Sequence, residues 1–302
     1  MPLPQAVRDR RAVLSATAAE TKAALPAVLH QLPDIRASLS EEFVLDQVPE
    51  LDPADCPRFN MSSDSESSAT LVKVINRDTL DAAIIMADSL VQPDPAAART
   101  QSVAMLSLAS DKTPGGGWLS GAMAQEEALC YRSSLSLSLH ALYYPWSPLT
   151  GLYTRDVVVV RSSLDSGHRL LSPPTPAAQL PVVSVISVAA IRRPAVRVAS
   201  VADTGQAAVF KYSADRRLTK SKMRLILRVA ANKKHELLVL GAFGCGAFRN
   251  PPEDVARCWL EVLGETEFSG GWWREIWFAV LDSRDEGNFR IFEGVLGGKR
   301  LE

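Results

Sequence analysis

A run of three glycines followed by two adjacent glutamates is the feature of this sequence best suited to chemistry. Glycine has no Cβ, so its backbone can approach a ligand closely and take positive φ. Neighbouring side chains on a helix diverge by about 100°, so of two adjacent carboxylates one can bind hydroxyls while the other reaches a reacting oxygen. The alternative is a pair of acids that only stabilises a helix N-terminus. The residues are Gly115, Gly116 and Gly117, then Gln125, Glu126 and Glu127.

A helix N-terminus raises a physical objection to an acid role for either glutamate. The positive end of the helix dipole favours the carboxylate form and lowers its pKa. A general acid needs a raised pKa at neutral pH, so burial or the negative charge of a ligand must outweigh the dipole.

A second glycine-containing segment, GAFGCGAFRNPPED at residues 241–254, joins an apolar strand to a helix. The pattern predicts Asn250 as the N-cap, Pro251 as the first helical residue and Glu253 as the partner in a capping box. Backbone N–H groups just before a helix start suit a phosphate or diphosphate, and the alternative is an ordinary tight turn. Neither segment is a Walker A or GxGxxG motif. The N–H groups concerned belong to Gly244, Cys245, Gly246, Ala247 and Phe248.

Apolar strands alternate with helices over most of the chain. This order indicates a largely parallel sheet covered by helices on both faces, with ligands at the carboxyl ends of the strands. The expected strands are 69–75, 102–109, 157–160, 181–190, 236–243 and 276–282, and the expected helices are 78–90, 124–142, 217–234 and 251–263.

The N-terminal part has a different composition. Residues 5–60 are rich in Ala, Leu, Arg and Glu with interrupting prolines, and residues 60–68 are acidic and serine-rich. We therefore expect a helical extension and an acidic, serine-rich loop over residues 1–68, and the main domain over residues 69–302. A Pro/Ala linker is expected at residues 92–98.

Charge and composition limit the classes of function. The chain has 302 residues, with 33 Lys+Arg against 34 Asp+Glu. A balanced charge argues against direct DNA binding, which needs a basic excess, but allows a pocket for one anionic ligand. The four cysteines and four histidines lack metal-ligand spacing, so we expect neither a metal nor a cofactor. The absence of a signal-peptide pattern and of a long apolar run favours a cytoplasmic or nuclear protein with no membrane contact.

The combination GGG, seven residues, QEE resembles the signature of the poly(ADP-ribose) glycohydrolases, a branch of the macrodomain superfamily. Segments 75–83, 181–190 and 237–256 look like the bacterial and fungal type of this enzyme, and the resemblance covers roughly residues 69–285. It implies a macrodomain-like three-layer α/β/α fold with a mixed, largely parallel central sheet and an N-terminal helical extension.

The resemblance also implies a reaction, which is hydrolysis of the ribose–ribose O-glycosidic bond in poly(ADP-ribose). Poly(ADP-ribose) or ADP-ribosylated proteins would be the substrate and ADP-ribose the product, in the context of the DNA damage response. Glu127 would act as general acid and then base, while Glu126 would bind ribose hydroxyls. Phe248 would pack on the distal ribose and Asp78 would contact adenine. The implied ADP-ribose-binding residues are Gly115, Gly116, Gly117, Gln125, Gly244, Cys245, Gly246, Ala247, Phe248 and Asp78.

Three segments depart from the family pattern. An Asn-bearing or Asp-bearing stretch before the glycines is replaced by residues 106–110, LSLAS, which puts a ribose-binding or Glu-orienting contact in doubt. Residues 191–193, IRR, stand where relatives often have Pro-Asn, and residues 153–156, YTRD, replace a YSPD-like stretch. Two alternative functions therefore stay open: an ADP-ribose-binding macrodomain with little turnover, and a mono-ADP-ribosyl hydrolase.

Three further features have a plain and a functional interpretation. Trp118 either covers the ligand as a lid or fixes the glycine segment to the body of the protein. Cys245 is expected to be a small packed residue. The basic run of residues 216–224 is either a solvated helix face or a guide for a polyanionic polymer. The run consists of Arg216, Arg217, Lys220, Lys222 and Arg224.

Overall fold

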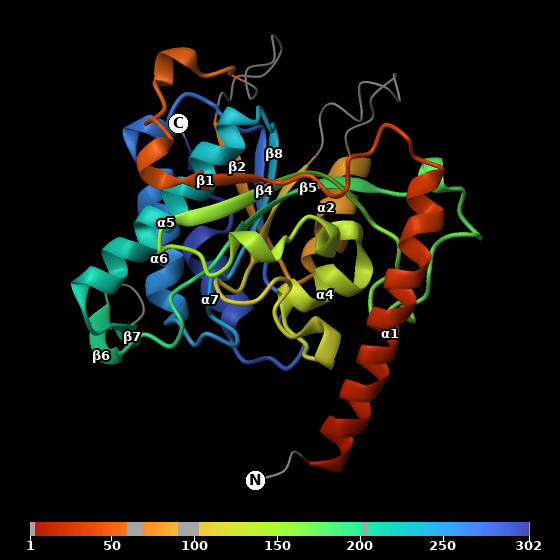
Figure 1. Cartoon of the computed structure of the whole chain (residues 1–302). Helices are drawn as coiled ribbons and strands as arrows, with labels where there is room; N and C mark the ends of the chain where they lie inside the picture. The colour runs from red at the N-terminus through yellow and green to blue at the C-terminus, as the bar shows by residue number, and fades with distance from the viewer. Residues whose placement is uncertain (1–3, 59–68, 90–102, 202–204, 302) are drawn as a thin grey trace.

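The computed structural model describes residues 4–58, 69–89, 103–201 and 205–301 (Figure 1). The expected serine-rich loop at 60–68 and the Pro/Ala linker at 92–98 lie outside these ranges. The division of the chain at residue 68 therefore stays a prediction.

The described residues form an eight-stranded sheet in the order β1-β4-β5-β3-β8-β9-β2-β10. The five central strands, from β5 to β2, run parallel, and the strands at the two edges are antiparallel. The strands are β1 (Glu41–Val44), β2 (Thr70–Ile75), β3 (Ala104–Leu108), β4 (Thr150–Val158), β5 (Val182–Val188), β8 (Leu237–Gly241), β9 (Glu275–Ala279) and β10 (Arg300–Leu301).

Helices cover both faces of this sheet, as the alternation of apolar residues requires. Leu238 and Leu240 of β8 lie in the core under α5 (Ser213–Asn232), α6 (Pro252–Leu263) and α7 (Asn288–Leu296). Leu237 and Val239 face the other core, under α1 (Gln5–His30), α2 (Thr79–Asp88) and α4 (Gln125–Arg132). Figure 1 shows these two groups of helices on opposite sides of the strands. The mixed three-layer α/β/α class predicted from the sequence is confirmed.

Several elements differ from the expectation. The helix predicted over 124–142 ends at Arg132, where Ser133 takes extended backbone and serines follow. The hydroxyls of Ser133 and Ser138 donate to the carbonyls of Leu129 and Leu135, at 2.7 and 2.9 Å, and such local bonds compete with helix continuation.

Five of the described elements were not expected from the sequence. Strand β1 lies inside the stretch expected to be helical, and it pairs with β4 at the edge of the main sheet. The hairpin of β6 (Val196–Val201) and β7 (Gly205–Phe210), helix α7 and the two-residue β10 were not expected either. Within the described ranges, none of the helices is both long enough and apolar enough to cross a membrane.

Candidate active site

The glycine loop, residues 109–124, follows the carboxyl end of β3. The Ser110 hydroxyl accepts the backbone N–H groups of Lys112 and Thr113, each at 3.2 Å, and so starts the turn. Gly115 and Gly116 have φ of +67° and +60°, a region that favours glycine. The chain therefore reverses directly over the start of α4.

Glu127 is held by two backbone donors. Its Oε1 accepts the Gly117 N–H at 2.9 Å, and its Oε2 accepts the Ala124 N–H at 3.0 Å. A Cβ at Gly116 would lie 2.4 Å from Glu127 Oε1 and 3.1 Å from Glu126 Oε2. A glycine is thus required at position 116, because any side chain there would collide with the carboxyl groups.

Glu126 is the more deeply buried of the two, with 3% of its surface exposed. Its Oε2 accepts the Ser110 N–H at 2.8 Å, while its buried Oε1 has no partner among the described residues. Burial, assisted by the negative charge of Glu127, raises the pKa of Glu126 to about 8 against the opposing effect of the Ser110 and Gly115 N–H groups. Burial therefore outweighs the helix dipole, and Glu126 is protonated at neutral pH.

Gln125 is bound to strand β3. Its Nε2 donates to the Leu106 carbonyl at 2.7 Å, and its Oε1 accepts the Leu108 N–H at 2.8 Å. The side-chain amide thus continues the hydrogen-bonding pattern of the strand edge. In this structure Gln125 fixes the first turn of α4 beside the glycine loop, where the sequence analysis expected an ADP-ribose contact.

Trp118 fixes the glycine loop to the body of the protein. Only 5% of its surface is exposed, and its ring packs edge-on against Tyr131 with centroids 6.1 Å apart. The Tyr131 hydroxyl lies 2.8 Å from the Trp118 carbonyl and 2.7 Å from that of Ala122, so one phenol bridges both ends of this turn. Of the two interpretations of Trp118, the structure favours the anchor over the lid.

Helix α1 supports the same loop from outside. A Cβ at Gly121, where φ is +74°, would lie 2.0 Å from the Arg11 carbonyl oxygen, so the two backbones touch there. The Ser15 hydroxyl donates to the Leu119 carbonyl at 2.8 Å. The N-terminal helix therefore positions the loop that carries the glycines, although more than 100 residues separate them in the sequence.

The second loop, residues 242–250, follows β8, the strand next to β3. Gly244 has φ of +76°, and a Cβ there would lie 2.6 Å from the Cβ of Ala190 and 2.4 Å from Asn250 Nδ2. The N–H groups of Gly246, Ala247 and Phe248 donate to no other residue that the structure describes. Three consecutive open donors at the carboxyl edge of the sheet are suited to bind an anion.

Cys245 is packed inside this loop. Burial raises the pKa of its thiol, which makes it a poor nucleophile, as expected of a small packed residue. In the described part of the chain, no three His, Cys, Asp or Glu side chains lie close enough together to hold a metal ion.

The predicted helix cap at Asn250 is wrong. Helix α6 begins at Pro252 with Pro251 as N-cap, and no side chain caps it. Asn250 instead turns back into the loop, where Nδ2 donates to the carbonyls of Ile191 at 2.7 Å and Gly244 at 3.1 Å. Its amide therefore ties the second loop to the segment after β5.

Asp78, expected to contact adenine, caps helix α2. Its Oδ1 accepts the N–H groups of Leu80 and Asp81, at 2.9 and 3.2 Å, and pairs with the buried Arg132. Arg132 also pairs with Asp81 at 2.5 Å and so joins α4 to α2. The contacts of Asp78 with Leu80, Asp81 and Arg132 all use its Oδ1 atom.

The structure accounts for one of the two contacts placed in doubt by the LSLAS segment. The Glu-orienting contact is made by the backbone N–H of Ser110, so it needs no Asn side chain. Ser107, in the middle of β3, is fully buried, and its hydroxyl has no partner among the described residues. The YTRD segment lies within β4, where the Tyr153 hydroxyl bonds His235 Nε2 at 2.9 Å in the core.

Two tyrosines near the carboxyl pair were missed by the sequence analysis. Tyr131, the loop anchor, follows Glu127 by one helical turn, and this spacing is the signal that could have found it. Tyr144 has a buried hydroxyl without a partner in the described ranges. Burial raises the pKa of Tyr144, and the carboxylate form of Glu126 raises it further, so the phenol stays protonated near the pair.

The fold and the site together define a class. A three-layer α/β/α domain with two glycine-containing loops at the carboxyl edge of neighbouring parallel strands is a macrodomain-like fold. Poly(ADP-ribose) glycohydrolase from Thermomonospora curvata shares this fold with a TM-score of 0.69 and 24% identity, over 94% of this chain and 99% of that chain. The same enzyme bound to the inhibitor ADP-HPD aligns with a TM-score of 0.66 and 25% identity, over 93% and 98% of the two chains.

A sequence match points to one family within this class. A family model described as microbial-type PARG, catalytic domain, matches residues 31–162, which contain both the glycines and the QEE sequence. Poly(ADP-ribose) glycohydrolase from Deinococcus radiodurans in complex with ADP-ribose is 28% identical, over 84% of this chain and 93% of that chain, with a TM-score of 0.61. No curated protein matches the sequence. The resemblance to the microbial-type poly(ADP-ribose) glycohydrolases is confirmed.

Proposed function

We propose that this chain hydrolyses the ribose–ribose O-glycosidic bonds of poly(ADP-ribose) and releases ADP-ribose. The observation that carries the proposal is the pair Glu126–Glu127, buried beneath Gly116 and held by backbone N–H groups. Relatives of similar fold have been solved with ADP-ribose and with the inhibitor ADP-HPD. ADP-ribose is accordingly the ligand that the site is proposed to hold.

The diphosphate is proposed to lie between the two loops. Backbone N–H donors that no described residue uses are supplied by Gly246, Ala247 and Phe248. Such uncharged donors bind phosphate oxygens. Gly244 and Cys245 form the turn that presents them, and the half-buried Phe248 ring is proposed to pack on the distal ribose.

Glu126 is proposed to bind the ribose hydroxyls. Its carboxyl is protonated at neutral pH because burial raises its pKa to about 8, so it can both donate and accept a hydrogen bond. Its unpartnered Oε1 leaves a buried polar atom unsatisfied, which costs about 1–3 kcal/mol. A ribose hydroxyl at this position would remove that cost.

Glu127 is proposed to transfer the proton. In the first step the protonated form of Glu127 donates its proton to the leaving hydroxyl oxygen as the bond from that oxygen to C1 of the ribose breaks, and the electron pair leaves with the oxygen. The ribose becomes an oxocarbenium-like cation, stabilised by the nearby diphosphate. In the second step the Glu127 carboxylate removes a proton from water, whose oxygen attacks C1. One residue thus serves as acid and base in turn, unlike the usual two-carboxylate pattern.

The geometry supports this assignment. Backbone donors from Gly117 and Ala124 fix both oxygens of Glu127, so the group keeps one orientation through both steps. Each carboxyl oxygen has two lone pairs, so an oxygen that accepts an N–H can also carry the transferable proton.

The test measures product release from defined substrates. Wild-type protein is incubated with poly(ADP-ribose) and with a mono-ADP-ribosylated protein, and free ADP-ribose is quantified. We expect release from the polymer. Affinity for ADP-ribose without release would identify a binding module, and release from the mono-modified protein alone would identify a mono-ADP-ribosyl hydrolase. Neither affinity nor release would reject the proposal.

The cytoplasm or nucleus is the compartment we expect for this activity. The four cysteines are free and buried in the structure, as is usual for proteins of a reducing environment. Fractionation of cells that express the full chain would test this expectation.

A further inference from the structure

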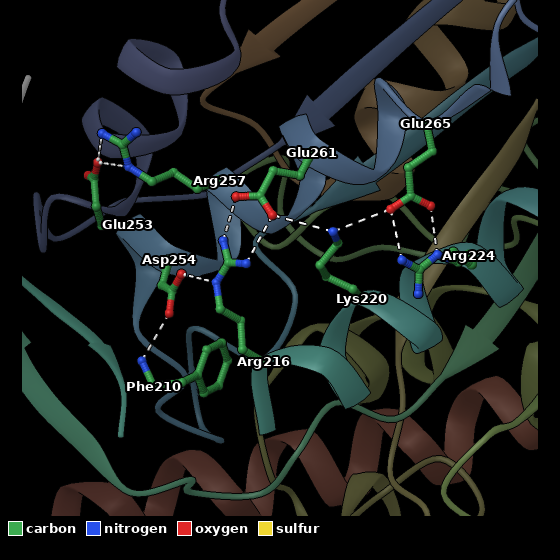
Figure 2. A network of polar contacts seen from close by, with 9 residues as sticks. All are labelled: Phe210, Arg216, Lys220, Arg224, Glu253, Asp254, Arg257, Glu261 and Glu265. Carbon is green, nitrogen blue, oxygen red and sulfur yellow. Dashed lines mark hydrogen bonds and ion pairs between the residues drawn. The ribbon is translucent and has the colours of Figure 1, made fainter. Parts of the chain in front are cut away.

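The basic run on helix α5 is not free to guide a polyanion. Arg216 pairs with Asp254 at 2.7 Å and with Glu261 at 2.6 Å, and Arg224 pairs with Glu265 at 2.6 Å. Lys220 lies 3.4 and 3.3 Å from Glu261 and Glu265. Figure 2 shows this network between α5 and α6. Acidic side chains therefore neutralise the positive charge that the sequence analysis singled out.

The remaining cations of that run face other partners. Lys222 is buried, and its Nζ donates to the carbonyl of Pro148. Arg217 donates to the Ser213 hydroxyl on its own helix, at 3.0 Å. A polyanion-binding surface would therefore consist of other exposed cations.

Three exposed arginines lie within the second loop or in the segment beside it. We call Arg192, Arg193 and Arg249 the arginine rim. None of the three makes an ion pair or a side-chain hydrogen bond with a residue that the structure describes. Residues 189–200 and 241–252 contain no acid, and the two acids that follow at 253 and 254 pair with other arginines, Arg257 and Arg216.

Backbone contacts fix the rim beside the open N–H groups. The Arg193 N–H donates to the Phe248 carbonyl at 2.7 Å, and Asn250 Nδ2 donates to the Ile191 carbonyl at 2.7 Å. The segment after β5 thus runs along the second loop. Arg193 and Arg249 both have left-handed backbone, with φ of 51° and 55°, a conformation that is uncommon for arginine and persists when the surroundings enforce it.

We infer that the arginine rim binds phosphates of poly(ADP-ribose) outside the pocket, next to the unit that is being cleaved. The inference rests on the proposed function and deepens it by naming the residues that distinguish polymer from free ADP-ribose. Every unit of the polymer carries a diphosphate, and arginine binds phosphate oxygens with paired N–H donors.

The test compares two double variants that each remove two positive charges. Arg192→Gln/Arg193→Gln removes the rim segment, and Lys22→Gln/Lys234→Gln is the matched control. Lys234 is also exposed and left-handed, with φ of 59°, but it precedes β8 and lies towards the opposite edge of the sheet. Lys22 is exposed on α1, which packs on the face of the sheet opposite to α6, the helix that follows the second loop.

Affinities for a polymer of defined length and for free ADP-ribose are measured over a range of salt concentrations. All proteins are the 302-residue chain with Glu127→Ala, which prevents cleavage. For the rim variant we expect the ratio of polymer affinity to ADP-ribose affinity to fall about tenfold, with a weaker salt dependence of polymer binding. The control should keep the ratio of the Glu127→Ala parent.

Four results would overturn the inference: an unchanged ratio, an equal loss for both ligands, an equal loss in the control, or displacement of polymer by single-stranded RNA of the same length and charge as efficiently as by polymer itself. The last result would indicate a general nucleic-acid surface. Failure of the proposed function is a separate outcome, since it would appear as no ADP-ribose binding and no product release by the wild type.

Discussion

The two glycine-containing loops follow neighbouring strands, yet they are built in opposite ways. In the glycine loop the N–H of Gly117, the carbonyl of Trp118 and the backbone of Gly121 are occupied by contacts within the protein. In the second loop three consecutive N–H groups have no partner among the described residues. The first loop therefore positions two carboxyl groups, and the second presents donors to a ligand.

This difference decides which glycines matter and why. Gly116 is required because a side chain would collide with the carboxyl pair. Gly246 has no atom within 4 Å of an added Cβ, so it leaves room for a ligand. Substitutions in the first loop should therefore act on catalysis, and those in the second on binding.

Among the substitutions that keep both carboxyl groups, the largest effect is expected for Gly116→Ala. The new Cβ would lie 2.4 Å from Glu127 Oε1, so the carboxyl group must move, and a displacement of about 1 Å can lower a rate by about 10²-fold. We expect release of ADP-ribose to fall at least about 10²-fold. The matched control is Gly205→Ala, because Gly205 also has positive φ, +78°, but has no atom within 4 Å of its Cβ position. Equal losses in both variants would mean that backbone strain, and not the contact with Glu127, is responsible.

The second loop allows a matched pair of its own. Gly244→Ala introduces a Cβ 2.4 Å from Asn250 Nδ2 and 2.6 Å from Ala190 Cβ at positive φ, whereas Gly246→Ala meets no atom. We expect Gly244→Ala to weaken ADP-ribose binding about 10–100-fold, measured by calorimetry, because the loop that presents the N–H groups must shift. Gly246→Ala should change the affinity less than about threefold in the absence of a clash with the ligand. A larger loss for Gly246→Ala would place the diphosphate directly against that residue.

The raised pKa of Glu126 predicts a loss of ADP-ribose binding at alkaline pH. Its pKa of about 8 leaves it protonated below this pH and charged above it, and a second carboxylate charge beside Glu127 opposes an anionic ligand. The ADP-ribose affinity should therefore be constant from about pH 6.5 to 7.5 and fall up to about tenfold per pH unit above 8. The diphosphate of the ligand stays ionised throughout. Glu126→Gln, which is neutral at every pH, should abolish this alkaline decrease, and an unchanged decrease in that variant would assign it to another group.

The smallest effect is expected for Tyr131→Phe. This change removes the hydroxyl that bridges the Trp118 and Ala122 carbonyls but keeps the ring. We expect a loss of about 1–2 kcal/mol in the free energy of unfolding, measured by urea titration, and a turnover about three- to tenfold lower. Tyr143→Phe removes a hydroxyl bond to the Ser40 carbonyl, away from the glycine loop, and should leave turnover unchanged. An equal loss of turnover in both variants would refute the anchoring role of Tyr131.

Local features of the fold and site were accessible from the sequence. The alternation of apolar strands and helices predicted the parallel centre of the sheet. The three glycines predicted the positive φ at Gly115 and Gly116, although Gly117 has a φ of −100°. These properties depend on residues close together in the chain, so pattern and spacing are enough to indicate them.

Features set by distant contacts were not accessible. The Arg11 carbonyl that touches Gly121 and the acids of α6 that neutralise α5 come from remote segments. The raised pKa of Glu126 depends on burial by the completed fold. The failed Asn250 cap has the same origin, because its amide finds better partners in the segment after β5 than at the helix start.

The most direct test of the account compares Glu127→Gln with Glu126→Gln, since both changes preserve shape and remove a titratable proton. Release of ADP-ribose from poly(ADP-ribose) and affinity for ADP-ribose are measured at pH 7 for both variants. The account predicts that Glu127→Gln lowers the release rate about 10²–10⁴-fold with nearly normal affinity, while Glu126→Gln retains most of the turnover. If Glu126→Gln is the inactive variant and Glu127→Gln still cleaves, the proton is carried by Glu126, and the proposed division of roles is contradicted.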